Sequence, residues 1–306
     1  MKKQIDIAGR VVGPGHAPYI IAELSANHNG RLETAMRIIE EAAKAGADAL
    51  KLQTYRPDTM TLDCDSEDFQ IHGGLWDGRT LYELYEEAHT PWEWHKPLFE
   101  HARKTGIPIF SSPFDTTAVD LLEDLNAPAY KIASFEAVDL PLIRYVAATG
   151  KPMIISTGMA DAEEIQEAIT AAREGGCRQL AILHCVSGYP APAEDYNLRT
   201  IVDMIGRFGL VTGLSDHTLD NTTAIASVVL GAAIIEKHFT LDRNGGGPDD
   251  SFSLEPEDLT ALCRDSKTAW KALGRVDYGR KSRAGQCPIS ALAVFCERYE
   301  SGGCDY

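Results

Sequence analysis

The sequence predicts an α/β fold in which eight parallel strands, each followed by a helix, close into a (β/α)8 TIM barrel. Short apolar runs alternate with longer amphipathic stretches from the start of the chain to about residue 273. The apolar runs show almost no polar alternation, which is typical of parallel strands that are covered on both faces. An open, doubly wound sheet is the alternative, but no GxGxxG motif opens the first helix and eight regular units favour closure.

Strands and helices are expected in alternation along the chain. Strands are predicted at residues 19–24, 47–53, 107–111, 129–133, 153–157, 180–184, 210–214 and 232–237. Helices are predicted at residues 32–45, 92–104, 116–125, 162–175, 198–207, 221–230 and 255–273. In the first helix Ala35, Ile39 and Ala43 recur at helical spacing and form an apolar stripe against the sheet.

A long connection after the second strand interrupts this alternation of strands and helices. Residues 54–91 form a segment rich in Tyr, Trp, Asp and Gly. A loop of this length in a compact domain is usually functional. Because it follows the carboxyl end of a strand, we expect it to form a wall of the substrate site. The alternative is a packing extension without a catalytic role.

Composition and charge limit the class of protein. The 306 residues are 44% hydrophobic and 24% charged, as in a globular domain, and the net charge is −16. This charge argues against a nucleic-acid partner, because it would repel phosphates. No 18-residue apolar stretch and no signal-type start are found, so no membrane partner is expected. Seven scattered cysteines without a CxxC pair indicate a reducing cytoplasm.

Polar side chains gather at the carboxyl ends of the predicted strands, where barrel active sites lie. They are Glu23, Lys51, Gln53, Ser112, Lys131, Ser134, Glu136, Ser156, Ser187, Tyr189, Ser215, His217 and His238. Two lysines among several hydroxyl groups suggest a site for an anion. For each lysine the alternative is a plain ion pair, Lys51 with Glu23 and Lys131 with Glu136.

Two histidines follow the last two predicted strands. His217 and His238 would converge on one metal ion if both side chains turn into the barrel mouth. They supply half of a usual ligand set, and water and a substrate oxygen would complete it, which is the pattern of a catalytic divalent ion. On spacing alone, two hydrogen-bonded rim histidines are an equal alternative.

Six ordered segments, taken together, resemble the sialic acid synthase family. They are residues 20–30 (IIAELSANHNG), 51–54 (KLQT), 130–134 (YKIAS), 156–159 (STGM), 213–218 (GLSDHT) and 236–240 (EKHFT). The resemblance runs from about residue 5 to about 275, so a synthase domain is predicted at 1–275. Four more segments resemble the branch of that family that makes pseudaminic acid: residues 52–55 (LQTY), 58–63 (DTMTLD), 75–78 (LWDG) and 89–94 (HTPWEW).

The resemblance implies a condensation of phosphoenolpyruvate with 2,4-diacetamido-2,4,6-trideoxy-L-altrose that gives pseudaminic acid and phosphate. It implies Mn²⁺ as the usual ion, with Mg²⁺ or Co²⁺ as substitutes, bound by His217 and His238 and polarising the sugar aldehyde. The other implied roles divide between the two substrates. Lys51, Lys131, Ser112, Ser134, Ser156, Ser187 and Ser215 would hold phosphate and carboxylate, Glu23 would orient or deprotonate water, and Glu136, Asp249, Tyr189 and Gln53 would contact the substrate, mainly the sugar.

Three other functions stay open at this point. An N-acetylneuraminate or legionaminate synthase would share the mechanism but take another sugar. A divalent-metal aldolase without phosphoenolpyruvate fits the two lysines less well. A catalytically silent, ligand-binding barrel is the alternative of another class.

Residues 276–306 are predicted to be a linker and an aberrant tail. Their last part, residues 284–306, resembles neither the barrel nor the family, which normally continues into a small antifreeze-like domain that packs across a dimer. Back-translating residues 286–305 and reading one nucleotide later can give a linker-like sequence that begins NVRFRRSLYFVKD. We therefore expect an out-of-frame tail that is poorly ordered, and reduced activity. A natural short variant is the alternative. A homodimer is compatible with the resemblance, although the domain that would lock it is missing.

Overall fold

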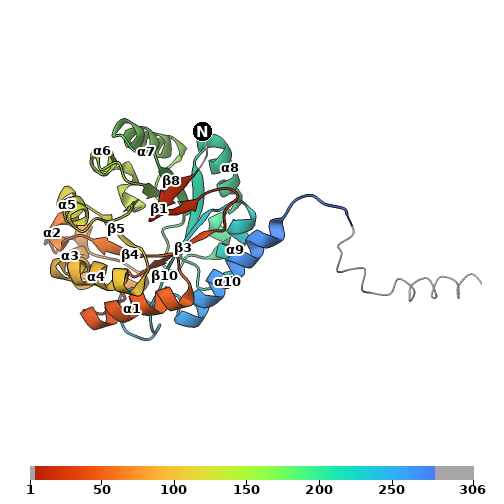
Figure 1. Ribbon diagram of the computed structural model, residues 1–306. Coiled ribbons are helices and arrows are strands. Elements are labelled where there is room, and N and C mark those ends of the chain that lie inside the picture. Colours follow the sequence, from red (N-terminus) through yellow and green to blue (C-terminus); the bar gives the residue numbers. More distant parts are fainter. Residues whose placement is uncertain (1–3, 280–306) are drawn as a thin grey trace, which may run out of the picture. The chain divides into compact units, whose positions relative to one another are not determined.

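Eight parallel strands close into a barrel in the computed structural model, which describes residues 4–279 (Figure 1). The strands are β3 (Tyr19–Glu23), β4 (Ala49–Thr54), β5 (Ile109–Pro113), β6 (Tyr130–Ile132), β7 (Met153–Ser156), β8 (Leu180–Cys185), β9 (Val211–Asp216) and β10 (Ile234–His238). Neighbours in sequence pair in parallel, and β10 pairs with β3 to close the sheet. The predicted TIM barrel is confirmed.

Helices cover the outside of the barrel. They are α1 (Leu32–Ala45), α4 (His95–Thr105), α5 (Thr116–Asp124), α6 (Leu140–Ala148), α7 (Ala162–Glu174), α8 (Arg199–Phe208), α9 (Thr222–Val229) and α10 (Pro256–Leu273). The sequence analysis did not predict α6. Its start carries a clear signal, however, because the Asp139 carboxylate caps the Leu142 backbone N–H and Pro141 stands in the first turn.

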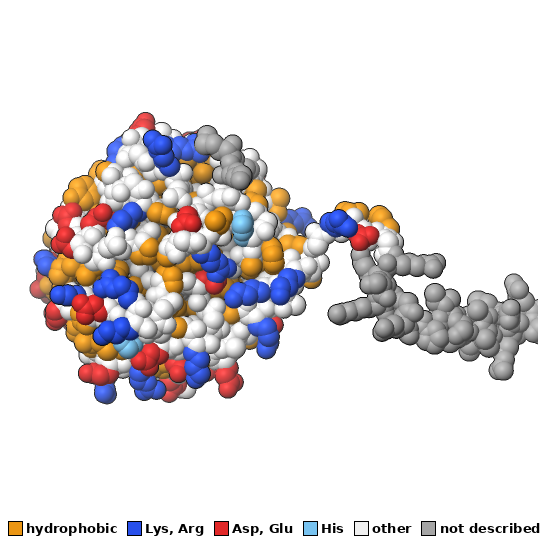
Figure 2. Space-filling model, in the orientation of Figure 1, with side chains coloured by type: hydrophobic (Ala, Val, Ile, Leu, Met, Phe, Trp, Pro, Cys, Tyr) orange, Lys and Arg blue, Asp and Glu red, His pale blue; other side chains and the backbone are white. Residues whose placement is uncertain are grey.

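The bottom of the barrel is closed by an amino-terminal hairpin. Strands β1 (Ile5–Ile7) and β2 (Arg10–Val12) pair antiparallel, and their buried side chains join an apolar cluster inside the barrel. Phe110, Ile154 and Leu183 belong to this cluster. The lower interior is therefore apolar and dry, which leaves the opposite end of the barrel for polar groups. On the face seen in Figure 2, acidic and basic side chains are interspersed.

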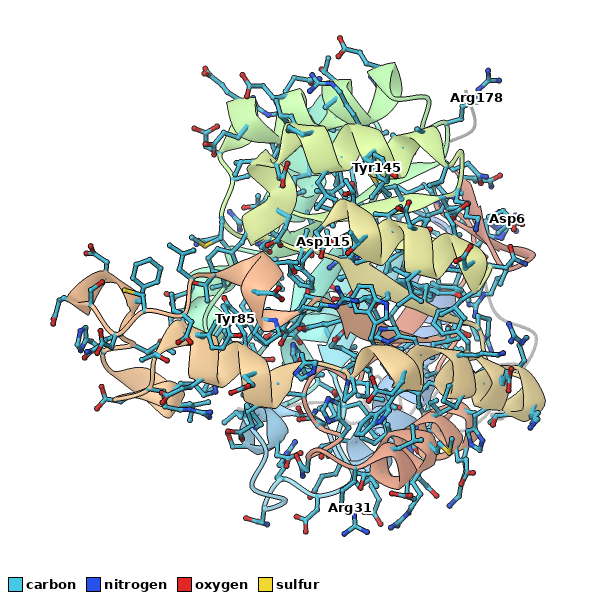
Figure 3. All side chains as sticks on the ribbon, turned by 90° about the vertical axis from the view of Figure 1, so that its left-hand side faces the viewer. Asp6, Arg31, Tyr85, Asp115, Tyr145 and Arg178 are labelled. Carbon is cyan, nitrogen blue, oxygen red and sulfur yellow. The ribbon has the colours of Figure 1, made fainter. Side chains whose placement is uncertain are left out.

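The long connection after β4 lies at the other end of the barrel. It contains α2 (Pro57–Met60), η1 (Glu67–Phe69), η2 (Gly74–Trp76) and α3 (Leu81–Ala88), and η3 (Trp92–Trp94) then leads into α4. Figure 3 shows α3, marked by Tyr85, on the side opposite to Asp6 of the hairpin. Residues 54–91 thus lie at the end of the barrel where the strands have their carboxyl ends.

The described residues up to Ala272 form one compact unit. The domain boundary predicted after residue 275 stays a prediction. Residues 280–306 lie outside the described residues, and they include the whole segment, from about residue 285 onward, that is interpreted as out of frame.

Close packing inside the barrel requires a glycine in β9. A β-carbon added to Gly213 would lie 2.7 Å from Leu183 Cδ2 and 2.8 Å from Ile234 Cβ. We expect Gly213→Ala to lower the free energy of unfolding by about 1–3 kcal/mol, because the extra methyl overpacks this layer. Gly206→Ala in α8 is the matched control, since nothing lies within 4 Å there. Urea unfolding of both variants checks this, and equal stability of the two would contradict it.

Candidate active site

Along the barrel strands, the side chains that point into the barrel are apolar at first and become polar toward the carboxyl end. In β4, Ala49 belongs to the inner apolar cluster, so Lys51 and Gln53, which follow at a spacing of two, also point inward. In β10, Ile234 belongs to the same cluster and the inward positions that follow are Glu236 and His238. The barrel mouth is therefore lined by charged groups held on rigid strands.

A buried cluster of two lysines and two carboxylates occupies the centre of this mouth. Lys51 forms a very close ion pair with Glu23, lies 3.6 Å from Glu236 Oε1 and donates to Ser112 Oγ at 3.2 Å. Lys131 donates to the same Glu236 Oε1 at 3.2 Å. Glu236 thus bridges the two ammonium groups, and all four charged side chains are almost fully buried.

The cluster shifts the pKa values of its members in different directions. For Glu23, burial raises the pKa to about 7, although the Lys51 ammonium opposes the shift. Burial also acts to lower the pKa of Lys51, but the carboxylates of Glu23 and Glu236 outweigh it and raise that pKa. For Lys131, burial dominates and lowers the pKa. In both cases the Glu236 carboxylate favours the ammonium form of the lysine.

Two buried hydroxyl groups at the carboxyl end of the barrel strands lack a hydrogen-bond partner among the described residues. They are those of Ser156 and Ser187. Ser134 Oγ accepts a hydrogen bond from the Gly158 backbone N–H at 3.2 Å. A β-carbon on Gly158 would lie 2.6 Å from Ser187 Oγ and 3.0 Å from Ser134 Oγ, so only glycine leaves these hydroxyls in place. Buried unpaired donors point to a ligand or ordered water at this position.

Two residues of the site were not predicted from the sequence. They are Glu236, which belongs to the charged cluster, and Cys185, which lies beside it. The Cys185 thiol is buried, which raises its pKa, and it contacts the hydroxyls of Ser134 and Ser215. Counting back by two from His238 along β10 would have found Glu236 as an inward-facing group. Lys131 pairs with Glu236, so the plain ion pair considered between Lys131 and Glu136 is replaced by this bridge. The pair between Lys51 and Glu23 is present.

The two predicted metal ligands lie side by side above this cluster. The ring centroids of His217 and His238 are 5.4 Å apart. The Nδ1 atom of His217 lies 2.8 Å from the Val186 carbonyl oxygen, which holds the proton on Nδ1 and leaves Nε2 unprotonated, as a metal ligand requires. Burial lowers the pKa of His217 to about 4 and that of His238 well below its usual value, so both rings are neutral.

These two rings fit a divalent ion as two of its ligands. His238 Nδ1 is buried and lacks a hydrogen-bond partner. Between residues 4 and 279, no group of three or more His, Cys, Asp or Glu side chains is arranged to hold a metal ion. The remaining ligands would therefore come from water and substrate, in keeping with an open catalytic site.

The sugar-side residues named from the resemblance also lie at this mouth. Asp249 Oδ2 accepts a hydrogen bond from Ser25 Oγ at 2.5 Å and lies 3.8 Å from His238 Nδ1. The Tyr189 ring lies 4.3 Å from the His217 ring. Glu136 has a buried, unpartnered Oε2, and burial raises its pKa to about 7. The structure thus brings the predicted residues to one end of the barrel, while their individual roles stay predictions.

A second buried ion pair holds the two histidine-bearing strands together from the outside. Lys237 and Asp216 are register partners in β10 and β9, and Lys237 Nζ lies 2.8 Å from Asp216 Oδ2. The same ammonium donates to the backbone carbonyls of Thr218 at 2.7 Å and Asp220 at 2.8 Å. Because Asp216 precedes His217 and Lys237 precedes His238, this pair fixes where the two histidines leave the sheet.

Comparisons with known proteins show the family of this chain. The model of the NeuB family matches residues 38–278. The chain belongs to the NeuB family. It is 48% identical over 266 residues to a pseudaminic acid synthase of Campylobacter jejuni, covering 86% of this chain and 78% of the relative. It is also 48% identical to the pseudaminic acid synthase of Helicobacter pylori over 257 residues, 84% of this chain and 76% of the relative.

A solved structure gives the same result for the fold. The N-acetylneuraminic acid synthetase of Leptospira borgpetersenii superposes with a TM-score of 0.82 at 28% identity, covering 98% of each chain. The predicted assignment to this family is confirmed, and the chain is an enzyme of the phosphoenolpyruvate-utilising nonulosonic acid synthase class. Within the described part of the chain, no helix is long and apolar enough to cross a membrane.

Proposed function

We propose that this chain condenses phosphoenolpyruvate with 2,4-diacetamido-2,4,6-trideoxy-L-altrose in the cytoplasm, giving pseudaminic acid and inorganic phosphate. The observation that carries the proposal is the buried array of Lys51, Glu236 and Lys131 beside unpartnered hydroxyls, because it suits a small polyanion. The choice of sugar is supported by the identity to pseudaminic acid synthases and by the segments of residues 52–94 that resemble that branch.

The anion end of the site would hold phosphoenolpyruvate. Lys51 and Lys131 would offset the charges of its carboxylate and phosphate, and Ser134, Ser156 and Ser187 would donate to the remaining oxygens. Glu236 keeps the two ammonium groups together when no anion is bound. Since these donors sit on strand ends and tight turns, little reorganisation is needed when phosphate departs.

The condensation forms one carbon–carbon bond and one carbon–oxygen bond from water, and it breaks the carbon–oxygen bond to phosphate. C3 of phosphoenolpyruvate attacks the sugar aldehyde carbon, water adds at C2, and phosphate leaves from the tetrahedral intermediate. Glu23, beside Lys51, would take the proton of the attacking water. Glu136 and Asp249 would orient the sugar. A divalent ion on His217 and His238, Mn²⁺ by family resemblance, would supply Lewis-acid polarisation of the aldehyde oxygen.

Phosphate release tests this function directly. The chain is incubated with phosphoenolpyruvate, Mn²⁺ and, in parallel, the diacetamido sugar, N-acetylmannosamine or the legionaminic acid precursor. We expect release with the first sugar only, its loss with EDTA and its return with added Mn²⁺. Release with another sugar would contradict the sugar assignment and keep the enzyme class. If the chain bound phosphoenolpyruvate but released no phosphate with any of the three sugars, a catalytically silent barrel would be favoured.

The raised pKa of Glu23 predicts the acid limb of the pH profile. A general base must be ionised, and the pKa of Glu23 is about 7, so kcat/KM should fall as the pH drops through 7. Below that value we expect about a tenfold fall per pH unit. In Glu23→Gln much of the activity should be lost, and the remaining kcat/KM should no longer fall as the pH drops through 7. A wild-type profile that stays flat from pH 8 to pH 5 would contradict the role of Glu23.

A further inference from the structure

One aromatic side chain of the long segment reaches back to the barrel mouth. Trp76, at the end of η2, donates its indole Nε1–H to the Pro248 carbonyl oxygen at 3.1 Å. Its ring also lies 6.0 Å from the Tyr189 ring. Trp76 is half-buried, whereas its neighbours Leu75 and Asp77 are exposed. The segment is therefore attached to the mouth through this indole.

Both contacts of Trp76 lead to the candidate active site. Tyr189 lies 4.3 Å from the His217 ring and 6.0 Å from the His238 ring, measured between centroids. Pro248 directly precedes Asp249, whose carboxylate lies next to His238. The indole thus lies against Tyr189 and Pro248, the two residues that connect it to the histidines and to Asp249, where the sugar is expected.

We propose that Trp76 determines sugar specificity by forming an apolar wall that selects a 6-deoxy, acetamido-substituted aldose over one with a hydroxyl at C6. This inference rests on the proposed function. The indole has a single hydrogen-bond donor, and the Pro248 carbonyl already uses it, so only the apolar ring remains for a ligand. A methyl group or an acetamido methyl packs against such a surface, whereas a hydroxyl would lose water without gaining a partner.

The expected ratio between the two sugar affinities follows from the apolar nature of the contact with Trp76. An apolar wall rejects an analogue that merely adds a hydroxyl by about 10- to 100-fold. We therefore expect wild-type chain to bind the diacetamido trideoxy sugar about 10- to 100-fold more tightly than its 6-hydroxy analogue, 2,4-diacetamido-2,4-dideoxy-L-altrose, which differs only at C6. In Trp76→Ala this ratio should fall close to one, mainly through weaker binding of the deoxy sugar.

Isothermal titration of both sugars, with Mn²⁺ present, tests the proposal on wild type and three variants. Trp76→Phe keeps an apolar ring but lacks the N–H, so it should retain part of the ratio. Leu62→Ala is the matched control, because Leu62 belongs to the same segment and is 68% exposed. It should bind both sugars as wild type does. Phosphoenolpyruvate affinity should be the same in all four proteins, which also reports that each is folded.

The outcomes separate this inference from the proposed function. A wild type that prefers the deoxy sugar, with an unchanged ratio in Trp76→Ala, overturns the inference and leaves the proposed function standing. An equal loss of both sugars in that variant overturns it too, since the residue would then hold the loop without selecting. A wild type that prefers the 6-hydroxy analogue, or binds neither sugar, contradicts the proposed function and the inference with it.

Discussion

Replacement of Lys131 by methionine is expected to lower kcat/KM for phosphoenolpyruvate by about 10²–10³, because it removes a preorganised charge from the anion end of the site. The Lys131 ammonium is buried and lies 3.2 Å from Glu236 Oε1. Without it, Glu236 faces Lys51 alone and the site loses one of its two cations. Phosphate release and calorimetric binding of phosphoenolpyruvate measure the two parts of the loss.

Lys44→Met provides the matched control for this experiment. Lys44 lies on the exposed surface of α1, where it pairs with Glu41 three residues earlier. Exposed pairs of this kind contribute about 0–1 kcal/mol, so activity and stability should stay near wild type. If Lys131→Met bound and turned over phosphoenolpyruvate as the control does, the assignment of this cluster to the anion would be wrong.

Replacement of Lys237 by methionine should cause the largest loss of stability, about 3–5 kcal/mol, because it leaves the Asp216 charge buried and unpaired. Lys237 is 2% exposed and also satisfies the Thr218 and Asp220 carbonyls. Since the pair fixes the strand ends that carry His217 and His238, Mn²⁺ affinity should fall as well, by about 10- to 100-fold. Urea unfolding and metal titration of the folded protein measure the two effects.

Two further variants show whether burial causes this effect. Arg207→Met removes the exposed partner of Asp203 in α8 and should cost no more than about 1 kcal/mol. The double variant Asp216→Asn/Lys237→Met should lose less stability than the sum of its single changes, because no unpaired charge remains. A Lys237→Met protein as stable as Arg207→Met would show that the buried pair does not hold the strands.

The barrel itself could be predicted from the sequence because parallel strands carry a strong local signal. Each is a short apolar run followed by an amphipathic helix, as in residues 19–24 followed by 32–45. The carboxyl-end position of Lys51, Ser156 and His217 then follows from topology alone. Helix α6 was not predicted, although Asp139 and Pro141 mark its start in the sequence.

The contacts within the site could not be predicted in the same way. Lys131 pairs with Glu236, which is 105 residues away, and not with Glu136 nearby in sequence. That choice depends on closure of the barrel, which brings β6 and β10 to face each other across its interior. Trp76 likewise reaches Pro248 across 172 residues. Long-range partners of this kind are set by tertiary packing and leave no local pattern.

We propose above that this barrel joins phosphoenolpyruvate to a diacetamido trideoxy sugar. The most direct measurement is to incubate the chain with carbon-13-labelled phosphoenolpyruvate, Mn²⁺ and that sugar, and to isolate the product for mass spectrometry and NMR. We expect pseudaminic acid that carries the three labelled carbons, with one phosphate released per molecule. Recovery of unchanged sugar beside labelled pyruvate, or of no labelled sugar acid at all, would contradict the account.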